Sequence, residues 1–402
     1  MSAHTDAQPI RIGQRAAHFQ ESVIREMTRL AEDVGALNLS QGLPDMPTPA
    51  AVSAAAAAAI TAGENQYTYP FGVTPFRQAV ARKTAAYNQI ACDPDENVTI
   101  TCGVSEAMAS VIFALTEPGD EAIIFQPWYE NYVPDCLMAG VRPVFVPLHE
   151  PDYSFDPAEL RAAFTNRTRL VLFNSPHNPT GRVFTRAELS EIARLCQEFG
   201  VIAVTDEIYE YILYAGHTHI SLGSLPGMED RCVTLSGLGK TFAVTGWRVG
   251  WAVAHADLTA QIRKVHDYLT ICAPGPFQYG GIAALALDEQ YYQRMRAEYA
   301  HQRSRLLEAL SAGGFTYTAP QGAYYVMADF SAIDWPRSRY TRPEWKLDRA
   351  FAEYLIREIG VAGVPGSSFY TGSGGETRIR FNFAKQDSVM AAAAERLRTA
   401  GV

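Results

Sequence analysis

The sequence is poor in cysteine, with six among 402 residues. The six are scattered through apolar surroundings and form no C-x-x-C pair, so neither a zinc site nor a disulfide framework is indicated. No other pattern predicts a metal site. We interpret the six cysteines as reduced thiols of a cytoplasmic protein: Cys92, Cys102, Cys136, Cys196, Cys232 and Cys272.

The sequence also lacks an excess of positive charge and long apolar runs. Lys and Arg number 34 against 43 Asp and Glu, and neither sign forms a long block, which disfavours nucleic acid and anionic membranes as partners. No segment is apolar for long enough to span a bilayer, and residues 1–15 lack the core of a signal peptide. We therefore expect a cytoplasmic protein that acts on small molecules.

Short β-branched runs alternate with helical patterns between residues 98 and 254, which predicts an α/β fold with a seven-stranded, mostly parallel sheet sandwiched by helices. Asp156-Pro157 and Thr185 are typical helix starts, and the alanine-rich run 50–60 predicts a packed helix. The strand candidates are VTITCG, EAIIFQP, RPVFVPL, RLVLFNSP, VIAVTDE, RCVTLSG and GWRVGWAVA.

The pattern changes after about residue 290 to a long polar helix, a strand at 322–329, a charged helix and a strand at 377–383. This predicts a smaller α+β domain. The expected organisation is an N-terminal arm with part of the small domain (1–57), a large domain that holds the cofactor (58–289) and a C-terminal small domain (290–402).

Residues 236–250, SGLGKTFAVTGWRVG, contain a Gly-Leu-Gly-Lys-Thr stretch that raises the question of a phosphate-binding loop. Such a loop needs a glycine at position 234, where the chain has Thr234. The residues that follow carry two glycines and a β-branched run, which is typical of a loop entering a strand rather than of a helix. An NTPase is therefore disfavoured, and Lys240 needs another role.

Polar residues follow four of the predicted strands: Gly103-Val-Ser105, Asn174-Ser-Pro-His-Asn178, Asp206-Glu-Ile-Tyr209 and Lys240. Taken singly, each has a simple structural explanation as a turn, a helix cap or a solvated side chain. Ligands of open α/β sheets gather at the carboxyl ends of the strands. The convergence of all four there predicts a functional site.

These motifs resemble those of the class I aminotransferases of fold type I, which use pyridoxal 5′-phosphate (PLP). The resemblance covers most of the chain in order and is closest to the kynurenine- and methionine-type branch, because of Leu-Ser-Gln-Gly, Asn-Gln-Tyr and Arg-Phe-x-Phe. The matching segments are LNLSQGLPD (37–45), NQY (65–67), NSPHNPTG (174–181), DEIY (206–209), Lys240 with TGWR (245–248) and RIRFNF (378–383).

The resemblance implies roles for the residues around the cofactor ring. Lys240 would form the internal aldimine with PLP and move the substrate α-proton. Asp206 would pair with the pyridinium nitrogen, so that the ring accepts electrons. Tyr209 and Asn178 would bind the phenolic oxygen, and Tyr129 would stack on the ring.

The resemblance also implies how the phosphate is held. Gly103, Val104 and Ser105 begin a helix whose N–H groups would bind it, and Arg248 would add a bidentate contact. Tyr67 would reach it from the neighbouring subunit, which implies a homodimer with shared active sites.

The substrate α-carboxylate would be bound by Arg380, with Gly42 and Asn178. One departure from the family concerns the phosphate: many relatives have a serine where this chain has Gly237. Whether Ser236 takes its place is open.

Several conspicuous residues have simpler interpretations. His177 is better explained as a packing or hydrogen-bonding residue than as an acid or base, because Lys240 already supplies that function. An aromatic cluster fits the core and the lining of a substrate pocket equally well: Tyr69, Phe71, Trp128 and Tyr132.

Transamination between an L-amino acid and a 2-oxo acid is the leading functional prediction, with a large neutral, aromatic or sulfur-containing donor. The alternative is α,γ-elimination, γ-replacement or carbon–carbon bond formation on S-adenosylmethionine or a similar amino acid, although Thr245-Gly-Trp-Arg248 looks more like the aminotransferases. A cofactor-sensing transcription regulator would need a DNA-binding module, for which the segment before Leu37 is too short and insufficiently basic.

Overall fold

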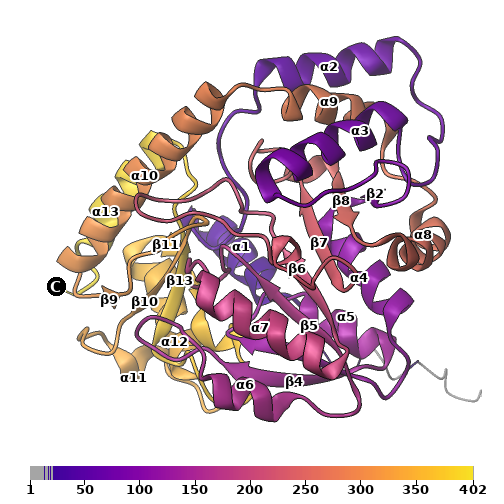
Figure 1. Cartoon of the computed structure of the whole chain (residues 1–402). Coiled ribbons are helices and arrows are strands. Elements are labelled where there is room, and N and C mark those ends of the chain that lie inside the picture. Colours follow the sequence, from indigo (N-terminus) through magenta and orange to yellow (C-terminus); the bar gives the residue numbers. More distant parts are fainter. Residues whose placement is uncertain (1–12, 14–16, 18, 20, 402) are drawn as a thin grey trace, which may run out of the picture.

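The computed structural model describes residues 13, 17, 19 and 21–401. A seven-stranded sheet lies at its centre (Figure 1), in the order β2-β8-β7-β6-β5-β3-β4. Only β8 runs antiparallel to its neighbours, so the predicted mostly parallel sheet is confirmed. The strands coincide with the seven predicted runs: β2 (Val98–Thr101), β3 (Glu121–Gln126), β4 (Arg142–Pro147), β5 (Thr168–Asn174), β6 (Ile202–Asp206), β7 (Cys232–Gly237) and β8 (Gly250–Val253).

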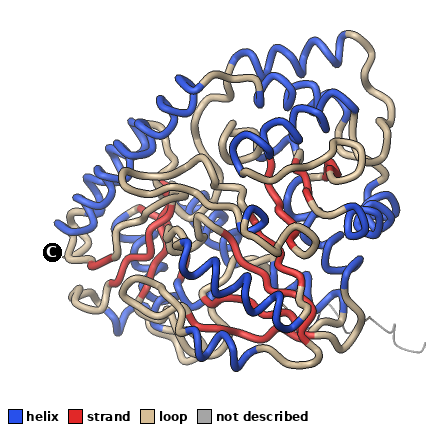
Figure 2. The backbone as a smooth tube through the Cα atoms, in the orientation of Figure 1, coloured by secondary structure: helices blue, strands red, loops and turns tan. Residues whose placement is uncertain are grey.

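Helices cover both faces of this sheet, because successive strand residues point to opposite sides. In β5, Val171 and Phe173 pack with α6 (Pro157–Ala163) and α7 (Arg186–Phe199). Leu170 and Leu172 pack on the opposite face, which is covered by α4 (Gly103–Leu115), α5 (Tyr132–Ala139) and α8 (Ala256–Thr270). Figure 2 shows the strands enclosed by helices.

The predicted helix starts are confirmed by their caps. The Asp156 carboxylate accepts a hydrogen bond from the Ala158 N–H at 2.7 Å, and Thr185 and Glu188 form a reciprocal capping box. The alanine-rich run forms α2 (Ala50–Thr61), which packs with α9 (Gly275–Leu285) near α3 (Thr74–Lys83) (Figure 1).

The C-terminal part contains a second, antiparallel sheet in the order β12-β13-β10-β9. Its apolar residues share one core with the long helix α10 and with α13. The elements are α10 (Glu289–Ala312), β9 (Thr316–Tyr317), β10 (Tyr325–Asp329), α11 (Arg337–Tyr340), α12 (Leu347–Tyr354), β12 (Val364–Pro365), β13 (Arg378–Asn382) and α13 (Asp387–Leu397).

The N-terminal segment joins this part of the molecule. After α1 (Val23–Val34), strand β1 (Leu37–Asn38) pairs in parallel with β11 (Val361–Ala362). A boundary at residue 57 would divide helix α2, so we propose that the large domain begins in the loop before Ala50. Among the described residues, no helix combines the length and apolarity that crossing a membrane requires.

Candidate active site

A cavity opens at the carboxyl ends of β5, β6 and β7, where the sequence predicts the functional site. It brings together residues from segments that are distant in the chain. Those of its lining that the sequence singled out are Gly103, Val104, Ser105, Tyr129, Tyr132, Asn174, Asn178, Asp206, Tyr209, Lys240, Thr245 and Arg248.

Gly103 and Arg248 form a close pair at the start of α4. Gly103 has φ +77°, and a Cβ atom at this position would lie 2.6 Å from Arg248 Nη2. Only glycine therefore leaves the guanidinium in this place, directly beside the first N–H groups of the helix. A helix N-terminus and an arginine together favour an anion such as a phosphate.

Asp206 ends β6 with its carboxylate in the cavity, and it is paired in register with Asn174 of β5. The Tyr132 hydroxyl donates to its Oδ2 at 3.0 Å, and the Ile208 N–H donates to its Oδ1 at 3.2 Å. Burial raises the pKa of this carboxyl to about 6, although both hydrogen bonds act in the opposite direction. A buried carboxylate of this kind fits a positively charged ring nitrogen.

Lys240 follows β7 and its ammonium donates a hydrogen bond to the Gly42 carbonyl at 2.6 Å. Burial lowers the pKa of Lys240 to about 8, with a further lowering by Arg380 and an opposing effect of Asp206. A substantial fraction of the amine is therefore neutral near physiological pH, the form that acts as nucleophile or base.

Arg380 is fully buried beside this site. Its guanidinium donates to Asn178 Oδ1 at 3.0 Å and to the Ser40 carbonyl at 2.7 Å, while its Nε has no hydrogen-bond partner among the described residues. Its charge lies over the rings of Tyr325 and Phe369. A buried arginine with no carboxylate partner is suited to bind a carboxylate from a ligand.

The model of the aminotransferase class I and II family matches residues 34–397. This chain belongs to that family. Amino-group transfer, use of PLP and fold type I architecture follow, and S-adenosylmethionine elimination is not favoured.

Known aminotransferases resemble the chain over nearly its whole length. Kynurenine–oxoglutarate transaminase 3 of Mus musculus is 33% identical over 402 residues, which cover 95% of this chain and 88% of that protein. Methionine aminotransferase of Escherichia coli strain K12 is 34% identical over 378 residues, covering 94% and 95%. The solved N-succinyldiaminopimelate aminotransferase from Mycobacterium tuberculosis has a TM-score of 0.91 at 34% identity, covering 97% and 100%.

Two tyrosines that the sequence does not single out lie behind the lining of the aminotransferase site, in contact with Tyr209. Tyr325 of β10 places its hydroxyl 3.0 Å from the Tyr209 hydroxyl. The hydroxyls of Tyr324 and Tyr325 each lie 3.3 Å from the Gly42 carbonyl oxygen, to which either can donate. The only available signal was the Tyr-Tyr pair within the predicted strand 322–329. The sequence marks Tyr132 only as a member of the aromatic cluster and gives no sign of its bond to Asp206.

Ser236 lies outside the cavity lining of the aminotransferase site. Its hydroxyl donates to Glu210 Oε1 at 2.7 Å, and Glu210 forms a buried ion pair with Lys83. A contact between Ser236 and the phosphate would therefore require its hydroxyl to leave Glu210. At Gly237, an added Cβ would meet the Val249 carbonyl oxygen at 2.9 Å.

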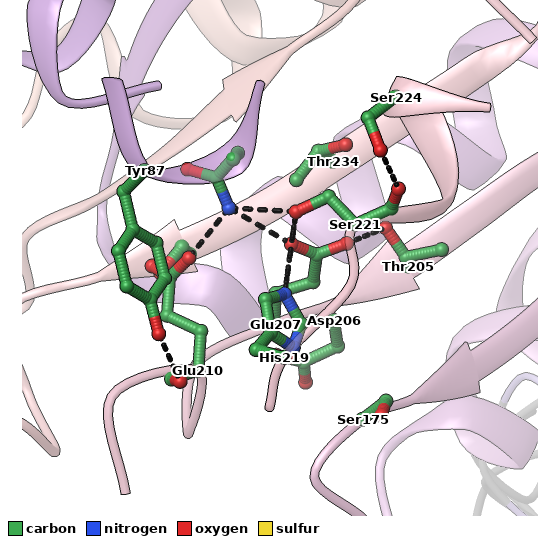
Figure 3. Close-up of polar contacts among 12 residues, drawn as sticks. Tyr87, Ser175, Thr205, Asp206, Glu207, Glu210, His219, Ser221, Ser224 and Thr234 are labelled. Carbon is green, nitrogen blue, oxygen red and sulfur yellow. Dashed lines mark hydrogen bonds and ion pairs between the residues drawn. The ribbon is translucent and has the colours of Figure 1, made fainter. Parts of the chain in front are cut away.

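The segment 206–210 has two faces. Asp206 and Tyr209 line the cavity, whereas Glu207 and Glu210 belong to a buried polar network behind it. Figure 3 shows this network, in which Ser221 donates to Glu207 at 2.6 Å. Its other members include Lys83, Asn88, Thr205, His219 and Ser236. The network fixes the segment from the side opposite to the cavity.

Two further residues lie away from this cavity. Tyr67 is 77% exposed and lines no part of that cavity. His177 is buried, its Nδ1 lies 2.8 Å from the Thr180 hydroxyl, and burial lowers its pKa to about 3. His177 is therefore a neutral hydrogen-bonding residue, in agreement with the interpretation from the sequence.

Proposed function

We propose that this aminotransferase takes the amino group of a large neutral L-amino acid, aromatic or sulfur-containing, and transfers it to a 2-oxo acid. The proposal rests on which positively charged side chains lie at the cavity. Among the described residues of one subunit, Lys240 and Arg248 line the cavity and Arg380 adjoins it, and each has a role of its own. No further lining cation is left for a side-chain carboxylate. The names of the kynurenine and methionine relatives agree with such donors.

We assign the cofactor contacts as follows. PLP, when bound, supplies a conjugated ring that accepts the electron pair left when the substrate Cα loses its proton. Asp206 is the partner of the ring nitrogen, and its buried carboxylate gains a compensating charge there. Tyr209 and Asn178, which line the cavity, would bind the phenolic oxygen, and Tyr129 would pack against the ring. Val104 and Ser105, together with Gly103 and Arg248, hold the phosphate.

Lys240 would bind the cofactor aldehyde through its Nζ with loss of water and, once the substrate amine displaces it, would take and return the α-proton. Its lowered pKa supports both tasks, because the neutral amine is the reactive form. Arg380 binds the substrate α-carboxylate, with Asn178 and Gly42 beside it.

We infer that the enzyme is a homodimer in which Tyr67 contacts the phosphate bound by the partner subunit. Tyr67 projects into solvent in one subunit, as does Tyr69, which is 60% exposed. Tyr268 is 93% exposed, and the neighbouring Leu269 and Ile271 are also exposed. Large apolar side chains left open in this way support a protein interface.

The donor is tested by mixing the PLP-loaded protein with single amino acids in the absence of a 2-oxo acid. Conversion of the cofactor absorbance, with release of the corresponding 2-oxo acid, identifies the donor. We expect kcat/KM for aromatic or sulfur-containing amino acids to exceed that for aspartate or glutamate by at least about 10-fold. The reason is that the side-chain carboxylate of an acidic donor would be buried in the cavity without a cation. Faster reaction with acidic donors would contradict the proposal.

The shared sites are tested by subunit mixing. Lys240→Ala and Tyr67→Ala homodimers are each expected to have little activity at limiting PLP. If Tyr67 serves the partner's site, hybrids of the two variants contain one site with both residues intact and regain activity. Mixtures that show only the sum of the separate activities would exclude the sharing of Tyr67.

A further inference from the structure

Tyr325 brings a second phenol next to Tyr209. Its hydroxyl lies 3.0 Å from that of Tyr209, and the two rings meet edge to face with centroids 5.7 Å apart. Only 1% of Tyr325 is exposed. The hydrogen bond between the two phenols is therefore shielded from competing water.

The direction of this hydrogen bond is open in the protein alone, because either oxygen can be the donor. A phenol has one proton to donate but can also accept. If Tyr209 donates its one proton to the phenolic oxygen of PLP, the Tyr209 oxygen can take part in a second hydrogen bond only as the acceptor. That second bond then needs a donor close to Tyr209. The Tyr325 hydroxyl has two acceptors for its single proton, the Tyr209 oxygen at 3.0 Å and the Gly42 carbonyl at 3.3 Å, and the shorter contact is the one with Tyr209.

The surroundings of Tyr325 hold its hydroxyl in place. A Cβ atom at Gly42 would lie 2.7 Å from that oxygen, so the glycine leaves room for it. The Arg380 guanidinium lies over the Tyr325 ring, 4.5 Å from its centroid. Burial raises the pKa of Tyr325 while Arg380 opposes this effect, so the phenol stays protonated at neutral pH. Other titratable groups that act on it are Tyr209, Tyr324 and Glu130.

We propose that Tyr325 is a positioning residue of this enzyme: its hydroxyl donates to Tyr209 and thereby directs the Tyr209 proton toward the phenolic oxygen of bound PLP. The proposal rests on the cofactor contact assigned above to Tyr209. Arg380 packs on the ring of Tyr325, so Tyr325 contacts both Tyr209 and the arginine assigned to the substrate carboxylate.

The test compares Tyr325→Phe with Tyr324→Phe as a matched control. Tyr324 is the adjacent residue, its ring also packs edge to face on Tyr209, and its hydroxyl contacts the same Gly42 carbonyl. It differs in making no hydrogen bond with the Tyr209 hydroxyl. The readout is the pH midpoint of the absorbance of bound PLP without substrate.

We expect Tyr325→Phe to raise this midpoint by about one pH unit, the size expected for one weakened hydrogen bond. A weaker Tyr209 contact leaves more negative charge on the phenolic oxygen, which holds the proton on the nearby Lys240 nitrogen more tightly. Tyr324→Phe should leave the midpoint in place. KM for the amino acid should change less than about twofold in Tyr325→Phe, because phenylalanine keeps an aromatic ring under Arg380.

Circular dichroism and the amount of bound PLP establish that both variants are folded. An unchanged midpoint with a raised KM in Tyr325→Phe would overturn the proposal and assign the hydroxyl to substrate binding. Equal shifts in both variants would overturn it in favour of general packing. Tyr209→Phe separates the two levels: if it shifts the midpoint and Tyr325→Phe does not, only the role of Tyr325 fails, and if neither does, the assigned role of Tyr209 fails as well.

Discussion

Lys240 Nζ donates a hydrogen bond to the carbonyl oxygen of Gly42 at 2.6 Å. This bond joins the loop after β7 to the N-terminal segment that follows β1, and the charges of Asp206 and Arg380 both act on the amine. Burial and Arg380 lower the pKa of Lys240 to about 8 against the opposing effect of Asp206, so more of the amine is neutral near physiological pH than in an exposed lysine.

The pH dependence of cofactor capture should report this environment. Because only the neutral amine attacks an aldehyde, the rate at which the PLP-free protein captures PLP should rise with pH and level off with a midpoint near the Lys240 pKa of about 8. Stopped-flow absorbance between pH 6 and pH 10 measures this rate. The reference is lysine whose α-amino group is blocked, so that only its side-chain amine, with a pKa of about 10.4, reacts. A midpoint near that of the reference would contradict the lowered pKa.

Replacement of Lys240 should abolish both the covalent attachment of PLP and turnover. Lys240→Ala is expected to lose turnover by at least about 100-fold, because the nucleophile and the base disappear together. Lys240→Arg keeps a positive charge without a neutral amine and should be as inactive. Turnover assays combined with denatured-state detection of covalently retained PLP check both variants, and substantial activity in either would remove Lys240 from its assigned role.

Arg380 should act on the substrate and not on the cofactor. Arg380→Ala is expected to raise KM for the amino acid by roughly 100-fold, through loss of a buried charge-assisted contact, and to leave the absorbance of bound PLP largely intact. Arg380→Lys keeps the charge but loses the bidentate geometry, so its KM should fall between that of the unmodified enzyme and that of Arg380→Ala. An unchanged KM in Arg380→Ala would place the carboxylate elsewhere.

Gly237 should not tolerate a serine side chain. A Cβ atom there would lie 2.9 Å from the Val249 carbonyl oxygen and 3.0 Å from Gly250 Cα, so Gly237→Ser should cost about 1–3 kcal/mol in the free energy of unfolding. Gly237→Ala adds the same Cβ without a hydroxyl. If Gly237→Ser binds PLP more tightly than Gly237→Ala in equilibrium dialysis, the added hydroxyl reaches the phosphate.

The buried pair of Lys83 and Glu210 should contribute to stability from behind the site. Lys83→Met leaves the Glu210 carboxylate buried without its cation, which should cost about 3–5 kcal/mol in urea unfolding. The double variant Lys83→Met/Glu210→Gln removes both charges and should recover much of this loss. A double variant as unstable as Lys83→Met would show that packing, and not the unpaired charge, is responsible.

The sequence by itself determined the features that depend on local patterns. The β-branched runs placed all seven strands, because strand formation and burial on both faces select such residues over a few positions. Asp156 and Thr185 marked helix starts because a cap acts within three residues. The polar residues after the strands predicted the place of the site, since strand topology brings these ends together.

Tertiary structure alone decided which side chains meet. Tyr132 reaches Asp206 across 74 residues of sequence, and Tyr325 reaches Tyr209 across 116. Ser236 turns to Glu210, although its neighbour in sequence suggested a place at the phosphate. Such contacts depend on how separate elements pack and on which face of its strand a residue occupies, and a shift by one residue would reverse that face.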